Sequence, residues 1–125
     1  MPDPRFLLDA NICIDILQGR STVAARRFAA CDVGQLVISA VAYAEVMIGA
    51  EQLDRVRQAR DFFAQIPVLA FDQDAGDAYS RLPFRRGSYD RLIAAQALAL
   101  GLTVVTSNTA DFQDVPGLKI EDWTR

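Results

Sequence analysis

Asp9 is the first acidic residue whose position suggests chemistry rather than simple solvation. It directly follows the apolar run 6–8, so we expect it at the carboxyl end of a buried strand. In parallel sheets covered by helices, ligands bind at that end of the strands. The alternative is that Asp9 caps the following helix, although Asn11 is better placed for that role. We therefore expect Asp9 to face a functional crevice.

Glu45 projects from an apolar face of a predicted helix. The residues three and four positions away are apolar or small: Val41, Ala42, Ile48 and Gly49. An isolated buried carboxylate is costly, so such a group usually becomes neutral or binds a cation. An arginine partner would satisfy it, but a second unusual acid farther along the chain favours a metal ion.

Asp90 lies in the first turn of the predicted helix 89–100, with Ile93 and Ala94 as apolar neighbours on the same face. An acid at this position is favoured by the helix dipole alone, by about 0.3–1 kcal/mol, so a capping role stays open. The small alanines beside Asp90 would, however, let this helix approach the sheet closely. Asp90 would then reach the same crevice as Asp9.

The segment 106–112 follows a β-branched strand and supplies the fourth candidate. Asn108 and Asp111 are both common turn formers, and we expect one of them to serve the site. Converging carboxylates repel one another and raise one another's pKa unless a divalent cation lies among them. All-oxygen ligands favour Mg²⁺ or Mn²⁺ over zinc.

The elements that must position these residues alternate as in an α/β fold. Strands are expected at 5–9, 36–39, 68–71, 102–106 and 118–120. Helices are expected at 12–18, 21–31, 40–49, 51–65, 72–82 and 89–100. The short connections favour a three-layer α/β/α arrangement around a mainly parallel sheet of about five strands. With 125 residues, the chain is expected to form a single domain over residues 1–125.

Composition excludes several other chemistries. Histidine is absent, which removes imidazole bases, Ser-His-Asp triads and HExxH zinc sites. The two cysteines, Cys13 and Cys31, form no CxxC pair, and we expect free thiols in a cytoplasmic protein. No signal peptide or membrane span is predicted. The net charge of −3 offers no general attraction for nucleic acid, so local groups must recruit any polyanion.

Five segments match one known pattern in the right order and span nearly the whole chain. They are residues 7–11, 38–49, 89–97, 106–112 and 115–123. Each is weak alone, but together they resemble the PIN-domain family, and specifically its VapC-like toxins of bacterial type II toxin–antitoxin pairs. The resemblance implies an endoribonuclease that acts on structured cellular RNA, often tRNA or ribosomal RNA. It also implies a homodimer and a cognate antitoxin protein encoded beside the toxin.

The resemblance further implies that Asp9, Glu45 and Asp90 are metal ligands, with Asp111 or Asn108 completing the cluster. Many members carry an acid at the position of Asn108, so a second metal is not expected here. Asp9 and Asp90 are expected to bind the ion directly. Glu45 is expected to orient or deprotonate the attacking water, or to bind the metal through a water.

Several other residues are expected to support the site. Asn11 and Thr106 are candidates for orienting the ligands, with capping and core roles as the alternatives. An arginine-rich patch beside Asp90 is expected to hold the RNA backbone, unless it is simply a solvated face. Its members are Arg85, Arg86 and Arg91, next to Phe84 and Tyr89.

Two other protein classes also place an aspartate after their first strand. Haloacid-dehalogenase phosphatases use an Asp-x-Asp pair, whereas the second position here is Asn11. A receiver-like, non-enzymatic Mg²⁺-binding module needs a lysine after its last strand, whereas Lys119 lies at or before the last predicted strand. Both alternatives therefore rank below the nuclease.

Overall fold

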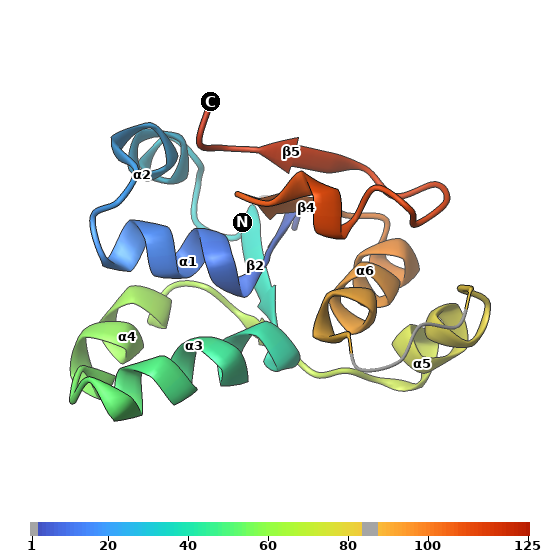
Figure 1. Ribbon diagram of the computed structural model, residues 1–125, viewed down its shortest axis with the longest axis horizontal. Helices are drawn as coiled ribbons and strands as arrows, with labels where there is room; N and C mark the ends of the chain where they lie inside the picture. Colours follow the sequence, from blue (N-terminus) through green and yellow to red (C-terminus); the bar gives the residue numbers. More distant parts are fainter. Residues whose placement is uncertain (1–2, 84–87) are drawn as a thin grey trace.

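A parallel β-sheet forms the centre of the molecule (Figure 1). Residues 3–83 and 88–125 are described in the computed structural model, and within them five strands pair in the order β3-β2-β1-β4-β5. The strands are β1 (Phe6–Leu8), β2 (Leu36–Ser39), β3 (Val68–Leu69), β4 (Thr103–Thr106) and β5 (Ile120–Asp122). All neighbouring strands are parallel. The chain moves from β1 outward to β3 and then returns to the other side of β1, so the strand order reverses between β1 and β4.

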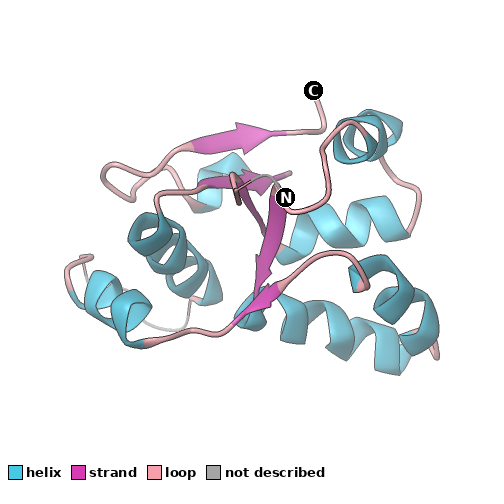
Figure 2. Ribbon diagram, turned by 180° about the vertical axis from the view of Figure 1, so that it is seen from behind, coloured by secondary structure: helices cyan, strands magenta, loops and turns pink. Residues whose placement is uncertain are grey.

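Helices cover both faces of this sheet. They are α1 (Ala10–Leu17), α2 (Thr22–Ala29), α3 (Ala40–Gln52), α4 (Val56–Phe63), α5 (Gln73–Ser80) and α6 (Tyr89–Leu100), with a short 3₁₀ helix η1 (Thr109–Asp111). Helices α1 to α4 lie on one side of the sheet, and α5 and α6 lie on the other (Figures 1 and 2). The predicted three-layer α/β/α architecture is confirmed.

Strand β1 lies at the centre of the sheet, and its side chains form part of the core. Phe6, Leu7 and Leu8 are all buried, because β1 has a paired strand on each side and a helical layer on each face. Alanines 94, 95 and 97 of α6 are fully buried, and their small side chains let this helix lie close to the sheet. Cys13 is buried and Cys31 is partly buried, and both are free thiols.

The structure corrects several predicted boundaries. Asp9, not Asn11, caps α1, because its carboxylate accepts a hydrogen bond from the Ile12 amide. Helix α3 continues to Gln52, and the break before α4 falls at Asp54, whose φ of 54° is left-handed.

Strands β3 and β5 also differ from their predicted extents. Strand β3 has two residues rather than four, since the carbonyls of Leu69 and Ala70 accept hydrogen bonds from the Gln96 side chain. Strand β5 begins at Ile120, where the predicted strand ended. Within the described residues, no helix has the length and apolar character needed to cross a membrane.

Candidate functional site

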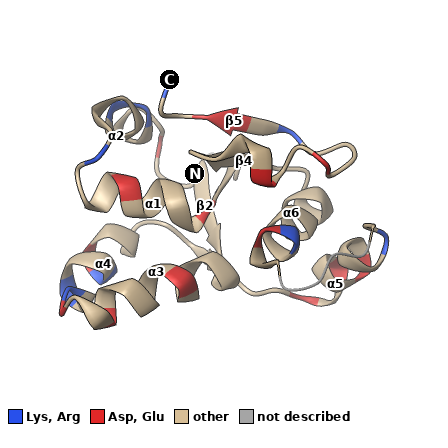
Figure 3. Ribbon diagram, in the orientation of Figure 1, with Lys and Arg blue, Asp and Glu red and all other residues tan. Residues whose placement is uncertain are grey.

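The topology places the predicted site residues at one edge of the sheet. Asp9 follows β1, and Thr106 ends the neighbouring β4. Helix α3 begins directly after β2, and α6 precedes β4, so the start of α6 returns to the carboxyl ends of the strands. Acidic segments of α3, α6 and the turn after β4 border this region, whereas many basic segments lie on α2 and α4 (Figure 3). This is the point where the strand order reverses and where such sheets bind ligands.

Asp9 is held rigidly in the interior and is only 2% exposed. Its Oδ1 accepts a hydrogen bond of 2.9 Å from the Ile12 amide, and its Oδ2 accepts one of 2.6 Å from Thr106 Oγ1. Burial raises the pKa of Asp9 to about 7, although both hydrogen bonds lower it, and the charges of Asp90 and Glu45 raise it further. Asp9 therefore caps α1 and belongs to the acidic site at the same time.

Glu45 on α3 and Asp90 on α6 interact electrostatically, and their two helices are in contact. Burial raises the pKa of Glu45, and the negative charge of Asp90 adds to this effect. The Glu45 Oε1 atom is buried and has no hydrogen-bond partner among the residues that the structure describes. Burial likewise raises the pKa of Asp90, and the neighbouring Asp111 carboxylate raises it further. An acid without a partner beside other acids is typical of a site that needs a cation.

The turn after β4 brings Asp111 into this group. The backbone N–H of Asn108 donates a hydrogen bond of 2.9 Å to Thr106 Oγ1. The side-chain Nδ2 of Asn108 donates one of 2.8 Å to Asp111 Oδ2. Asp111 also lies within hydrogen-bonding reach of Asp90. Asn108 thus shapes the turn, while Asp111 reaches the other acids.

These four acids are without a basic partner in the part of the chain that the structure describes. No ion pair there involves Asp9, Glu45, Asp90 or Asp111. Equally, no three acidic or thiol side chains of the described residues are arranged so that they could hold a metal ion as they stand. The donor set suits an ion such as Mg²⁺, which keeps several waters and takes only one or two carboxylates directly.

Arg91 is buried, whereas the sequence pattern predicted it to be exposed and to contact RNA. Its side chain is 3% exposed, with Nη1 paired to Asp114 Oδ2 and Nη2 donating to the Pro83 carbonyl. The expectation that Arg91 contacts RNA is therefore corrected, because these acceptors and its burial keep the guanidinium from a phosphate. No sequence pattern predicts this role, since Asp114 resembles an ordinary turn residue.

The other predicted supporting residues have different positions. Arg85 and Arg86 lie outside the described residues, so their role stays a prediction. Asn11 is exposed, and its side chain has no hydrogen bond among the described residues. Thr106 is fully buried and contacts Asp9 directly.

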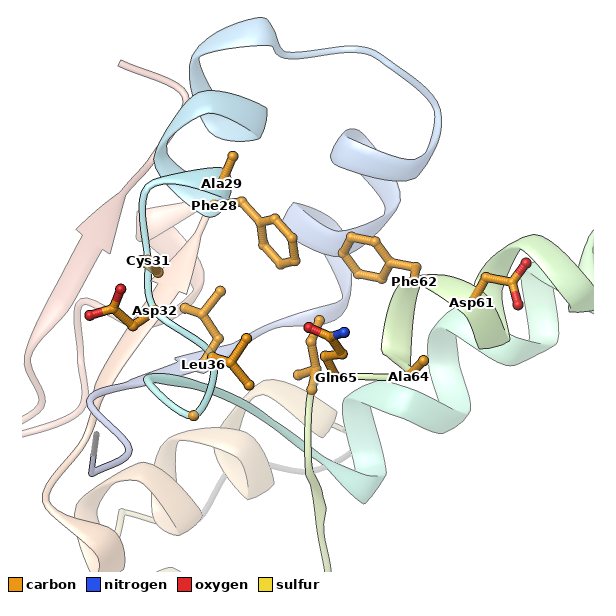
Figure 4. A pocket seen from close by; sticks show the side chains of 12 residues that line it. Phe28, Ala29, Cys31, Asp32, Leu36, Asp61, Phe62, Ala64 and Gln65 are labelled. Atoms are coloured by element: carbon orange, nitrogen blue, oxygen red, sulfur yellow. The ribbon is translucent and has the colours of Figure 1, made fainter. Parts of the chain in front are cut away.

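The opposite edge of the sheet carries features unrelated to these acids. A pocket of about 340 Å³ lies there, lined by α2, α4 and the segment that leads into β2 (Figure 4). The rings of Phe28 and Phe62 stack within it, with their centroids 5.1 Å apart.

Lys119 directly precedes β5, so it also lies at this amino edge of the sheet. Lys119 therefore cannot serve as the lysine that a receiver-like module needs at the carboxyl edge.

Comparison with known proteins identifies relatives over almost the full chain. Residues 6–118 match the PIN domain. The tRNA(fMet)-specific endonuclease VapC of Shigella flexneri is 33% identical over 131 residues, covering 96% of this chain and 98% of the relative. The protein of the same name from Salmonella typhimurium is 31% identical, covering 95% and 98%.

Solved structures show the same architecture. DNA-bound VapBC from Salmonella typhimurium has a chain with a TM-score of 0.84 and 29% identity, covering 96% of this chain and 98% of that one. VapBC-1 from nontypeable Haemophilus influenzae gives a TM-score of 0.81 at 27% identity, with coverage of 96% and 98%.

Proposed function

Because this chain belongs to the PIN-domain family and, within it, to the VapC endonucleases, we propose that it is the ribonuclease toxin of a toxin–antitoxin pair. Its curated relatives from Shigella flexneri and Salmonella typhimurium are tRNA(fMet)-specific endonucleases, so we propose tRNA as the substrate class. The observation that carries this proposal is a group of buried or half-buried acids at the strand-order reversal, which have no basic partner within residues 3–83 and 88–125.

We propose that Asp9, Glu45, Asp90 and Asp111 form the metal-binding site. PIN-domain nucleases use divalent metal ions, and the oxygen-only donor set favours Mg²⁺, with Mn²⁺ as a substitute. A bound ion would polarise a phosphate oxygen and lower the pKa of water. The unpartnered Oε1 of Glu45 supports its assignment as a ligand or as the acceptor for a water's proton.

The chain's own residues would prepare this site in distinct ways. Asp9 is fixed by the Ile12 amide and the Thr106 hydroxyl, so its carboxylate needs little reorganisation when a cation binds. Asp90 and Asp111 come from α6 and from the turn after β4, so two separate elements would supply acids to the same ion. Arg85 and Arg86 are proposed to hold the RNA backbone at the start of α6.

We also propose a cognate antitoxin as the protein partner and a homodimeric toxin. The structural relatives from Salmonella typhimurium and Haemophilus influenzae are VapBC structures, and one chain of each matches this chain over 96% of its length. Co-expression with the antitoxin encoded beside it should suppress toxicity and give a complex that co-purifies.

The direct test is cleavage mapping on total RNA with Mg²⁺, with and without EDTA. The wild-type protein should produce a few defined 3′-hydroxyl and 5′-phosphate ends in tRNA, and EDTA should abolish them. Asp90→Asn should lower cleavage at least about 100-fold, as expected when a ligand of the reacting centre is lost. Asp77→Asn, on the exposed side of α5, is the matched control and should cleave normally. Wild-type cleavage by Asp90→Asn would refute the assignment, and covalent phosphorylation of Asp9 would favour a phosphatase.

A further inference from the structure

Arg91 is a buried arginine directly beside a proposed metal ligand. Its side chain is 3% exposed, and its Nη1 lies 3.1 Å from Asp114 Oδ2. Its Nη2 donates a hydrogen bond of 2.7 Å to the Pro83 carbonyl. Burying a guanidinium is costly unless good partners satisfy it, so this arrangement requires an explanation beyond surface charge.

The contacts of Arg91 join three segments behind Asp90. Arg91 itself follows Asp90 in the first turn of α6. Asp114 lies in the turn that follows η1, three residues after Asp111. Pro83 belongs to the connection between α5 and α6. One guanidinium therefore fixes the start of α6 to both neighbouring loops.

The turn 108–114 brings Asp111 within hydrogen-bonding reach of Asp90, so its position relative to α6 depends on how the turn is attached. At one end of the turn, Asn108 is anchored through Thr106, which in turn holds Asp9. At the other end, the Arg91–Asp114 ion pair draws the turn toward α6. The turn is thus attached at both ends, to β4 through Thr106 and to α6 through Arg91.

We propose that Arg91 is a positioning residue: through Asp114 and Pro83 it holds the turn 108–114 against α6, so that Asp111 stays beside Asp90. The inference rests on the proposed function for its effect on catalysis, whereas its structural part does not. It replaces the RNA contact expected from the sequence. Arg91 then acts on metal affinity and turnover without touching RNA.

Hydrogen exchange of the metal-free protein tests the structural part without any assay of activity. Arg91→Met keeps most of the aliphatic volume but removes both contacts. We expect at least tenfold faster exchange at the amides of 111–115, with the central strands β1 and β4 unchanged. Arg57→Met, an exposed arginine on α4, is the matched control and should leave these amides protected. Unchanged exchange at 111–115 in Arg91→Met would overturn the proposal.

Metal binding and kinetics test the effect on the site. Arg91→Met should bind Mn²⁺ at least tenfold more weakly and lower kcat, while RNA binding in EDTA stays within about twofold of wild type. Arg91→Lys keeps the charge but reaches fewer acceptors, so it should restore part of both losses. Asp114→Asn should resemble Arg91→Met. It provides the test if Arg91→Met does not fold. Reduced RNA binding in EDTA with normal Mn²⁺ affinity would overturn the proposal in favour of an RNA contact.

The proposed nuclease function and the positioning role of Arg91 can fail separately. If the wild-type protein cleaved no RNA but Arg91→Met still released the turn 111–115, the proposed nuclease function would fail and the structural role of Arg91 would stand. If the wild-type protein were an active nuclease and Arg91→Met matched it in exchange, Mn²⁺ affinity and kcat, only the positioning role would fail.

Discussion

The Thr106 hydroxyl donates a hydrogen bond of 2.6 Å to Asp9 Oδ2 and thereby links the last residue of β4 to the acid that follows β1. The two strands are neighbours at the reversal of strand order. The same hydroxyl accepts a hydrogen bond from the Asn108 amide. One buried side chain thus orients an acid and fixes the turn that carries Asp111.

Thr106→Val should preserve the strand but lose this orientation. Losing a hydrogen bond that orients a metal ligand costs roughly 10–100-fold in metal affinity or activity. The Thr106 hydrogen bond lowers the pKa of Asp9, so its removal should raise that pKa and move the acidic limb of the kcat/KM profile to higher pH. Thr103→Val, at the other end of β4, is the control. A wild-type pH profile for Thr106→Val would contradict this role.

The metal-free protein should become less stable as pH rises toward 8. Burial raises the pKa of Asp9 from 3.8 to about 7 in the folded state, so folding favours its protonated form. This contribution is fully present below about pH 4 and is lost as pH rises through 7, with a cost on the order of 4 kcal/mol. Thermal unfolding in EDTA should show a Tm that falls over this range in wild type and less in Asp9→Asn. An identical pH dependence in the two proteins would contradict the assignment.

Divalent metal should reverse that loss at pH 8. Glu45→Gln removes the charge of a carboxylate whose Oε1 has no partner in the described part of the chain, so its Tm in EDTA should equal or exceed that of wild type. Added Mn²⁺ should stabilise wild type strongly and Glu45→Gln weakly, because a ligand for the folded state raises its stability by mass action. Glu51→Gln, exposed on the same helix, should respond like wild type. Equal stabilisation of all three proteins would exclude Glu45 from the site.

Trp123 should anchor the C-terminal strand to the core. It is 1% exposed, and its ring meets Phe6 edge-to-face at 5.1 Å while Arg27 lies over it. Trp123→Ala should cost roughly 3–5 kcal/mol of unfolding free energy, measured by urea denaturation. Trp123→Phe should cost less because it keeps an aromatic ring in contact with Phe6. A loss below about 1 kcal/mol for Trp123→Ala would show that β5 contributes little.

Local sequence pattern determined much of this protein. The apolar run before Asp9, the small alanines after Asp90 and the left-handed Gly101 at the end of α6 are features that near neighbours decide. The alternation of strands and helices then allowed few arrangements other than a parallel three-layer fold. The position of Asp9 at the carboxyl edge followed directly from that fold.

Tertiary structure decided what sequence neighbours could not. Arg91 appears in the sequence as part of a basic patch, but burial and the distant Asp114 turned it inward. Asn108 and Asp111 were equivalent turn formers until the approach of Asp111 to Asp90 on α6 separated their roles. In both cases the deciding contacts join residues from different elements, and side-chain partners over such separations depend on packing, which local propensity does not encode.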